Sequence, residues 1–220
     1  MKLFLDTANL EQIKDAISKG LIQGVTTNPS LLAKEPKTDF YGHIEKIIEL
    51  CKDSSFPLSV EVFAEDPDAM ISQGKEMMER FNYQNLNIKI PVGPEEMRVI
   101  HQLYTDNIKV NCTCCFSATQ MQLAAAAGSR YVSLFYNRLL DAGGDPLTIL
   151  RRVRNFIDEN GYHCEIIAGS IRNAYDLENC WDAGAHIVTA SYDAIIKGTQ
   201  HPKTTESING FLNDFKDWIN

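Results

Sequence analysis

Short apolar runs alternate with helical patterns along the whole chain, and this alternation restricts the possible folds more than any other feature. Eight runs have the length that is typical of β-strands, and most of them are rich in Val, Ile, Leu or Phe. The expected strands cover residues 2–6, 24–27, 57–63, 86–92, 109–115, 131–135, 164–168 and 186–190. Each strand is followed by a stretch with helical character, so the chain reads as successive βα units.

Helix signals occupy the stretches between the strands. Asn9 and Gln12 have the spacing of a capping box, and Gly20 ends the helix that they open. The expected helices cover residues 9–19, 39–52, 118–127, 173–183 and 193–197, and three more have Pro67, Pro94 or Pro146 in their first turn.

Eight βα units in about two hundred residues predict an α/β fold, a single (β/α)8 TIM barrel over residues 1–204. A doubly wound open sheet is the alternative, because its local pattern is the same and only closure differs. Residues 205–220 predict an extra C-terminal amphipathic helix, with Phe211, Phe215 and Trp218 at helical spacing. We expect this helix to pack on the barrel or on a neighbouring subunit.

Composition and charge narrow the choice of partners. The chain has a net charge of −8, which disfavours nucleic acid and anionic membranes but leaves small anions possible. No stretch is apolar enough to span a bilayer, and the N-terminus reaches Asp6 without a signal-peptide core. We therefore expect a cytoplasmic enzyme or scaffold that binds small molecules.

Six cysteines in a chain of 220 residues do not predict a disulfide framework. Cys112 and Cys115 form a C-x-x-C pair, which can mean zinc or redox chemistry. They fall in an expected strand, where positions three apart face opposite sides, and no second ligand pair exists. We expect buried small side chains here and no metal site.

Polar residues interrupt the apolar pattern of most strands, above all Lys89 in the centre of the run Leu86-Asn87-Ile88-Lys89-Ile90. In a barrel, one face of each strand looks inward and the active site lies at the carboxyl ends of the strands. The side chains that we expect to converge there are Asp6, Thr27, Asn28, Glu61, Lys89, Asn111, Thr113, Ser133, Phe135, Arg138, Ser170 and Arg172.

Each of these residues also has an ordinary structural explanation. Lys89 could be a solvated surface cation, and Asp6 could interact with the N-terminus of a nearby helix. As a set they fit lysine chemistry, because a desolvated amine attacks a ketone and needs acids and bases beside it. Lys89, Asp6 and Glu61 with Thr113 supply those groups, and arginines at the rim supply an anion site.

The motifs that carry these residues resemble those of the transaldolase family, in particular its short members, which include fructose-6-phosphate aldolases. The resemblance covers essentially the whole chain. It rests on LDTA at 5–8, GVTTNPS at 24–30, EV at 61–62, IKIP at 88–91, residues 111–116, residues 131–138 and AGSIR at 168–172.

The resemblance implies a role for each candidate residue. Lys89 would form a Schiff base with the substrate, Asp6 would be the acid/base at its C4 hydroxyl, and Glu61 with Thr113 would order a catalytic water. No metal and no cofactor are implied, and short family members form rings of five or ten subunits. The remaining implied substrate contacts are Thr27, Asn28, Asn111, Ser133 and Phe135 for the sugar, and Arg138, Ser170 and Arg172 for a phosphate.

Two positions favour transfer over simple aldol cleavage. The aldolase members carry glutamine and tyrosine where this chain has Glu61 and Phe135. We therefore expect a transaldolase that moves a dihydroxyacetone unit from fructose 6-phosphate, or an analogue with a terminal anion, to an aldose such as glyceraldehyde 3-phosphate.

Three alternatives stay open. Leu134, Gly169, Asn173-Ala174 and the loop 139–145 depart from the family near the arginines, so the donor could be a sulfonated ketose, 6-deoxy-6-sulfofructose. The second alternative is a fructose-6-phosphate aldolase. The third is a barrel without catalysis that binds sugar phosphates or acts as an oligomeric scaffold.

Overall fold

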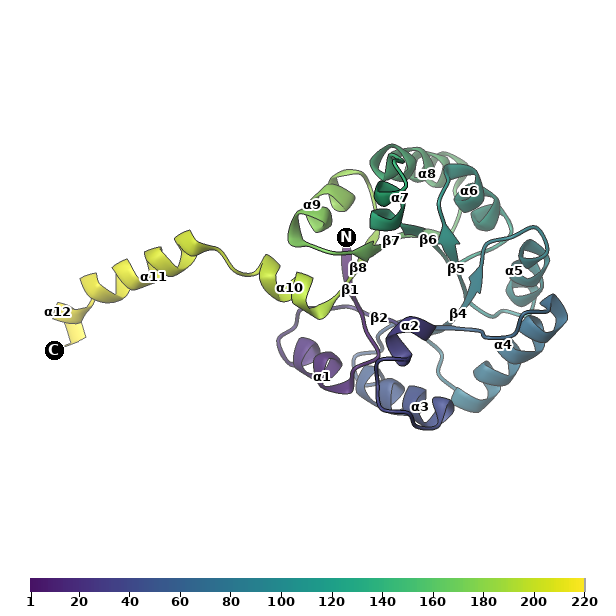
Figure 1. Cartoon of the computed structure of the whole chain (residues 1–220), viewed down its shortest axis with the longest axis horizontal. Helices are drawn as coiled ribbons and strands as arrows, with labels where there is room; N and C mark the ends of the chain where they lie inside the picture. Colours follow the sequence, from purple (N-terminus) through teal and green to yellow (C-terminus); the bar gives the residue numbers. More distant parts are fainter. Residues whose placement is uncertain (220) are drawn as a thin grey trace.

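Eight parallel strands pair in sequence order, and the last pairs with the first to close a barrel, in a computed structural model that describes residues 1–219 (Figure 1). The strands are β1 (Lys2–Asp6), β2 (Val25–Thr26), β3 (Leu58–Glu61), β4 (Leu86–Pro91), β5 (Val110–Cys115), β6 (Tyr131–Phe135), β7 (Glu165–Ile171) and β8 (Ile187–Ala190). The closed order confirms the TIM barrel and excludes the open, doubly wound sheet.

Helices surround the barrel, and a C-terminal pair extends away from it (Figure 1). Those around the barrel are α1 (Leu10–Ser18), α2 (Pro29–Leu32), α3 (Phe40–Cys51), α4 (Pro67–Phe81), α5 (Glu96–Thr105), α6 (Ala118–Ala126), α7 (Tyr136–Asp141), α8 (Pro146–Asn160), α9 (Ala174–Asp182) and α10 (Tyr192–Gly198). The short helices α2 and α7 were not expected, because four to six residues are too few to show helical periodicity.

Several helices begin at the capping residues that the sequence predicts. The Asn9 side chain accepts a hydrogen bond from the Gln12 backbone at the start of α1, and Ser117 and Gln120 form a complete capping box on α6. Pro67 and Pro146 occupy the first turns of α4 and α8. Pro94 was placed wrongly, because α5 begins two residues later, at Glu96.

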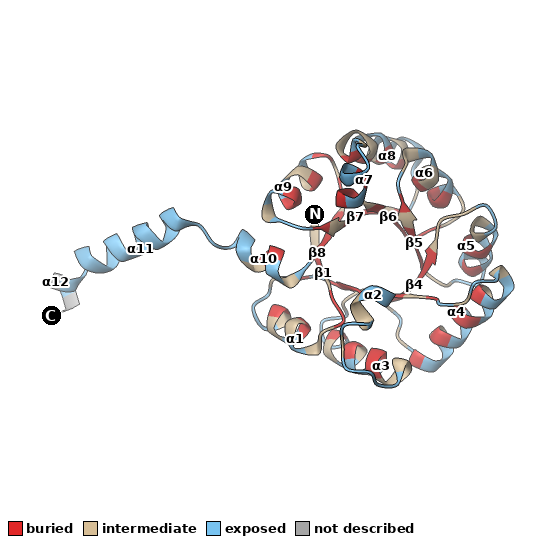
Figure 2. Ribbon diagram, viewed as in Figure 1, coloured by how far each residue is buried: buried red, intermediate tan, exposed pale blue. Residues whose placement is uncertain are grey.

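Apolar side chains form two separate cores. The larger lies between the outer face of the strands and the helices, where buried positions line the inner sides of the helix ring (Figure 2). The smaller lies inside the barrel and consists of Phe4, Tyr131, Ile167 and Ile187, with the Phe4 and Tyr131 rings edge to face at 6.3 Å. This inner cluster is an apolar floor beneath the polar residues at the carboxyl ends of the strands.

Below the floor, charged side chains meet at the amino-terminal end of the barrel. Glu165 at the start of β7 accepts hydrogen bonds from Lys2 at 2.8 Å and from Arg130 at 2.6 Å. Burial raises the pKa of Glu165, but the two cations outweigh that effect and lower it below its usual value. The cluster joins β1 and β7 with Arg130, the residue that precedes β6, at the end of the barrel away from the polar mouth.

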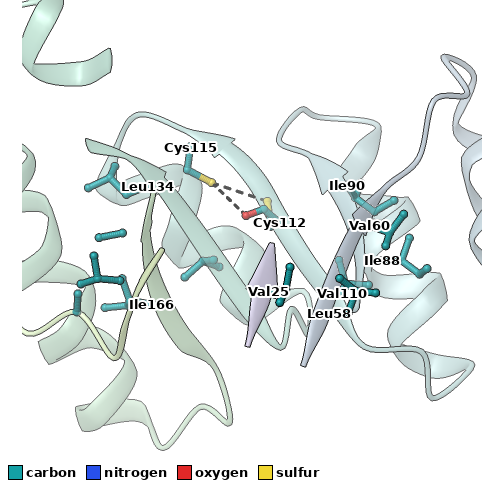
Figure 3. Packing of buried hydrophobic residues seen from close by; sticks show 14 of the residues in the cluster. Val25, Leu58, Val60, Ile88, Ile90, Val110, Cys112, Cys115, Leu134 and Ile166 are labelled. Carbon is teal, nitrogen blue, oxygen red and sulfur yellow. Dashed lines mark hydrogen bonds between the residues drawn. The ribbon is translucent and has the colours of Figure 1, made fainter. Parts of the chain in front are cut away.

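A β-bulge near the end of β5 corrects the expectation for the C-x-x-C pair. The register with β6 shifts between Cys112 and Cys115, and Cys114 between them has a left-handed φ of 60°. Because of this bulge, the Cys112 and Cys115 Sγ atoms lie on the same side, 3.8 Å apart, inside the larger core (Figure 3). The prediction that they face opposite sides is therefore wrong, although both are buried as expected.

The C-terminal segment projects away from the barrel as α11 (Pro202–Asp214) and α12 (Lys216–Ile219) (Figures 1 and 2). The expected single helix over 205–220 starts earlier and breaks at Phe215, and Asn220 lies outside the described residues. This C-terminal arm exposes a set of large apolar side chains, Ile208, Phe211, Leu212, Phe215 and Trp218. No helix within residues 1–219 has the length and apolar character needed to cross a membrane.

Candidate active site

A polar cavity of about 200 Å³ opens at the carboxyl ends of the strands. Its position above the apolar floor is the place where barrels of this type carry their active sites. It is lined by Asp6, Thr26, Asn28, Ser30, Leu31, Lys34, Lys89, Asn111, Thr113, Ser133, Phe135, Arg138, Gly169, Ser170 and Thr189. Nine of the residues that the sequence analysis selected are in this lining.

Lys89 lies in the interior of the barrel and is only 5% exposed. Its Nζ donates a hydrogen bond to the Thr27 carbonyl at 2.8 Å and pairs with Glu61 Oε2 at 2.9 Å. The pairing follows from strand register, because Glu61 on β3, Lys89 on β4 and Asn111 on β5 are direct neighbours. A solvated surface role for this lysine is thereby excluded.

Asp6 ends β1 and lines the cavity. Burial raises the pKa of its carboxyl, while the positive charge of Lys89 and a hydrogen bond from Thr26 oppose that rise. Thr26 Oγ1 donates to Asp6 Oδ1 at 2.7 Å. A carboxyl with a raised pKa, held beside a buried amine, is suited to exchange protons with a bound molecule.

Hydroxyl and amide groups from β5 and β6 form another wall of the cavity. Ser133 donates to Asn111 Oδ1 at 2.6 Å, and Asn111 Nδ2 donates to Ser59 at 3.1 Å. Thr113 Oγ1 is buried and has no hydrogen-bond partner among the described residues. An unpaired buried hydroxyl is costly, so Thr113 is suited to bind a polar group in the cavity.

Asn28 and Thr27 follow β2 and play different parts. The Asn28 side chain caps α2 by accepting from the Leu31 backbone at 3.0 Å, and it also lines the cavity. The Thr27 hydroxyl donates to the Ser59 carbonyl at 2.9 Å. Thr27 therefore contacts Lys89 through its backbone carbonyl, while its side chain forms a hydrogen bond with β3.

The cationic side of the cavity contains Arg138 on α7 and Ser170 at the end of β7. The Arg138 guanidinium lies over the Phe135 ring, 4.8 Å from its centre, which orients it at the rim. Arg172 does not line the cavity, because its guanidinium pairs with the Asp141 carboxylate, with Nη1 to Oδ1 at 3.0 Å. The structure thus brings one of the two expected arginines to the cavity.

Some lining residues were not selected from the sequence. Thr189 interrupts the apolar strand β8 in the way that Lys89 interrupts β4, so the same signal could have found it. Thr26 could have been found likewise, as the last residue of β2. The other additions are loop, helix and glycine positions that no strand pattern marks, namely Ser30, Leu31, Lys34 and Gly169.

This arrangement is suited to carbonyl chemistry. A buried amine with an adjacent carboxylate can form an imine with a ketone, and a second carboxyl can move a proton at a neighbouring hydroxyl. Within residues 1–219, no three His, Cys, Asp or Glu side chains come together as ligands for a metal ion.

Comparison with solved structures supports the fold. A thiamine phosphate pyrophosphorylase from Pyrococcus furiosus superposes with a TM-score of 0.63 over 90% of this chain and 93% of that one. The two sequences are only 13% identical, so this likeness concerns the barrel alone.

Sequence comparison is more specific. The family described as "Transaldolase/Fructose-6-phosphate aldolase" matches residues 3–219. Proteins named "Probable transaldolase" from Clostridium acetobutylicum and Methanococcus maripaludis are each 40% identical to this chain over the full length of both sequences. Another with that name, from Halalkalibacterium halodurans, is 39% identical over the same extent. The family match over nearly the whole chain and the closed barrel agree, and the chain belongs to the transaldolase/fructose-6-phosphate aldolase family.

Proposed function

We propose that this protein is a transaldolase that transfers a dihydroxyacetone unit from a ketose with a terminal anion to an aldose, through a Schiff base on Lys89. The observation that carries the proposal is the buried Lys89 Nζ, 2.9 Å from the Glu61 carboxylate in a cavity that also contains Asp6. Fructose 6-phosphate is the proposed donor and glyceraldehyde 3-phosphate the proposed acceptor.

The first half of the reaction binds the ketose covalently. Glu61 accepts a proton from the Lys89 ammonium, and the free amine adds to the ketose C2 carbonyl. The carbinolamine then loses water to give the imine, with the leaving hydroxyl protonated through Glu61 and a water bound to Thr113. The unpaired Thr113 hydroxyl, which lines the same cavity as Lys89, supports that route.

The second half breaks and remakes a carbon–carbon bond. The Asp6 carboxylate takes the C4 hydroxyl proton, the C3–C4 bond breaks, and its electron pair moves into the iminium to give an enamine on Lys89. The aldehyde leaves, and the enamine attacks the carbonyl carbon of the acceptor, whose oxygen receives the proton from Asp6. Hydrolysis of the new imine releases the product and restores Lys89.

Transfer is preferred over aldol cleavage because the enamine must survive until the acceptor arrives. Phe135 offers no acidic hydroxyl at the cavity, and its ring lies edge to face with Phe116 at 5.7 Å. The Phe135 ring lines the cavity in which the enamine would form and is apolar. A fructose-6-phosphate aldolase would release dihydroxyacetone without an acceptor, which separates the two activities.

The terminal anion of the donor would bind at the Arg138 side of the cavity, with Ser170 beside it. Arg172 joins the site only if its guanidinium leaves Asp141. A single arginine with a serine suits a singly charged sulfonate as well as a phosphate, so 6-deoxy-6-sulfofructose is the second candidate donor.

Borohydride trapping tests the central step. With the ketose donor present, reduction should add the mass of the reduced dihydroxyacetone or ketose adduct to the Lys89 peptide in wild type and in the control Lys14→Ala, whose lysine is exposed. The Lys89→Ala variant should give neither adduct nor transfer. Unmodified wild-type protein, or transfer by Lys89→Ala, would refute the mechanism.

A donor panel tests the terminal group and the reaction type. Fructose 6-phosphate and 6-deoxy-6-sulfofructose are each assayed with and without glyceraldehyde 3-phosphate. Transfer requires the acceptor, whereas aldol cleavage releases dihydroxyacetone without it. Binding of a donor with neither product nor adduct would instead indicate a non-catalytic binder or scaffold.

The C-terminal arm is proposed to pack on a neighbouring subunit, so that residues 1–204 form the catalytic barrel and residues 205–220 the contact. Its exposed apolar side chains support this assembly, because a stripe of this size is costly in water. The proposed assembly is a homo-oligomer of five or ten subunits.

A further inference from the structure

Three side chains at the mouth of the barrel form a continuous hydrogen-bonded chain. Thr189 Oγ1 lies 2.6 Å from Thr26 Oγ1, and Thr26 Oγ1 lies 2.7 Å from Asp6 Oδ1. They come from adjacent strands, with β1 paired to β2 on one side and to β8 on the other. Both threonines are nearly inaccessible, at 3% and 4% exposed, so bulk solvent screens these bonds only weakly.

The donor and acceptor in each of these hydrogen bonds follow from the number of hydroxyl protons available. An ionised carboxylate only accepts hydrogen bonds, so the single hydroxyl proton of Thr26 belongs to the bond with Asp6. The short contact between the threonines therefore needs the hydroxyl proton of Thr189. The chain runs from Thr189 to Thr26 to Asp6 whenever Asp6 is charged.

We infer that Thr189 is a positioning residue for the acid/base Asp6 and acts on it through Thr26. This inference rests on the proposed function, in which Asp6 removes the C4 hydroxyl proton. Donation from Thr189 polarises the Thr26 hydroxyl and strengthens its bond to Oδ1, since hydrogen bonds in a chain reinforce one another.

The hydrogen-bonded chain of side chains also determines which carboxylate oxygen of Asp6 takes the proton. Thr26 occupies Oδ1, and no described residue donates to Oδ2. Oδ2 is therefore the oxygen that takes the proton, while Oδ1 and the two hydroxyls hold the carboxylate plane in place. Positioning of this kind affects the cleavage step and leaves imine formation at Lys89 unchanged.

Valine substitutions test the chain because valine keeps the shape of threonine and removes its hydroxyl. Thr189→Val should lower kcat for transfer about fivefold, the effect of one hydrogen bond, and leave the rate of borohydride trapping at Lys89 unchanged. It should also move the acidic limb of the kcat–pH profile to higher pH by about half a unit, because the carboxylate loses stabilisation. Thr189→Ser should restore both values.

Additivity separates an indirect role from a direct one. Thr26→Val should have the larger effect, and the double variant Thr26→Val/Thr189→Val should behave like Thr26→Val alone, because Thr189 acts only through Thr26. Additive losses, or an increase in KM with an unchanged acidic limb, would mean that Thr189 contacts the substrate directly and would overturn the inference.

Two controls keep the outcome interpretable. Thr189→Ala removes the same hydroxyl without the branched methyl of valine, so a shift produced by packing would appear in one variant and not in the other. An unchanged acidic limb in both would refute the inference. Failure of the wild type to form the Lys89 adduct would refute the proposed function, so the two failures are distinguishable.

Discussion

The Lys89 ammonium and the Glu61 carboxylate face each other across neighbouring strands, with Nζ 2.9 Å from Oε2. The side chains are 6% and 18% exposed, so water screens the pair only weakly. The opposite charges attract each other across the two strands, and in the proposed mechanism the Glu61 carboxylate accepts the proton that the Lys89 ammonium loses. The contact is therefore proposed to serve both the resting site and its activation.

Glu61→Gln should slow the formation of the Lys89 adduct about 100-fold at neutral pH, the effect of losing a positioned proton acceptor. The amide keeps the shape of the side chain but does not accept a proton from the ammonium. The measurement is the rate of borohydride trapping with fructose 6-phosphate. Glu65→Gln, at an exposed position, is the matched control, and an equal effect of both substitutions would contradict the role of Glu61.

Asp6→Asn should lower transfer activity about a thousandfold while making the protein more stable at neutral pH. Burial raises the pKa of Asp6 above its ordinary value of 3.8, so the folded state favours the neutral acid. The stability of the wild type consequently decreases as the pH rises through the folded-state pKa, and asparagine has no such cost.

The melting temperatures of wild type and Asp6→Asn, measured from pH 3 to pH 8, check this sign. Their difference should vanish at the acid end, where Asp6 is neutral in both the folded and the unfolded state. Asp53→Asn, an exposed aspartate, should show no such trend. A variant less stable than wild type at neutral pH would be the contrary result.

Glu165→Gln should destabilise the fold by about 1 kcal/mol at pH 7 and leave catalysis unchanged. Lys2 and Arg130 lower the pKa of Glu165, so its contribution is present above the unfolded-state pKa and is lost as the pH falls through the lower folded-state value. Urea unfolding of the variant and wild type should therefore converge in acid. Glu159→Gln on the exposed side of α8 is the control.

Cys114 should be the first of the six cysteines to react with a maleimide in the folded protein. It is partly exposed, and the other five are buried. Burial, followed by the negative charge of Glu61, raises its pKa above 9.0, so the labelling rate should still be increasing at pH 9. Peptide mass spectrometry locates the label, and equal labelling of Cys51 or Cys180 would show that the core opens.

Replacing Phe211 and Phe215 together by serine should convert the proposed oligomer into monomers. The two rings are 71% and 55% exposed on the isolated chain, and burying each contributes about 1.5–3 kcal/mol. Light scattering measures the molar mass. The control changes polar arm positions, Thr205→Ser with Asn209→Ser, and a wild type that is monomeric would contradict the proposed assembly.

The barrel could be predicted from the sequence because its strands and helices differ in periodicity and alternate without interruption. The ends of the elements were less predictable, since pairing with neighbours decides them: β2 retains two residues, and β7 continues to Ile171. The inward face of each strand followed from alternation, which placed Lys89 and Asp6 in one cavity.

The local sequence pattern did not predict side-chain positions where the backbone departs from ideal strand geometry. It also did not predict interactions between residues that are far apart in the sequence. The left-handed conformation of Cys114 reverses the expected facing of Cys112 and Cys115. The partner of Arg172, which follows β7, is Asp141 at the end of α7, a contact that spacing does not reveal. Thr189 carried a usable signal, a hydroxyl within an apolar strand, of the same kind as Ser133 on β6.

The row of Glu61, Lys89 and Asn111 across β3, β4 and β5 couples the chemistry of this protein to the pairing of its strands. Deleting one residue from β4 would turn every later side chain to the opposite face, placing Ile88 or Ile90 in the cavity and Lys89 among the apolar side chains of the helices. Catalysis and folding would fail together. Mutations that change substrate preference are therefore expected in the loops and short helices at the rim. Insertions or deletions in β3, β4 or β5 are expected to be lost, because they disrupt the site and the fold together.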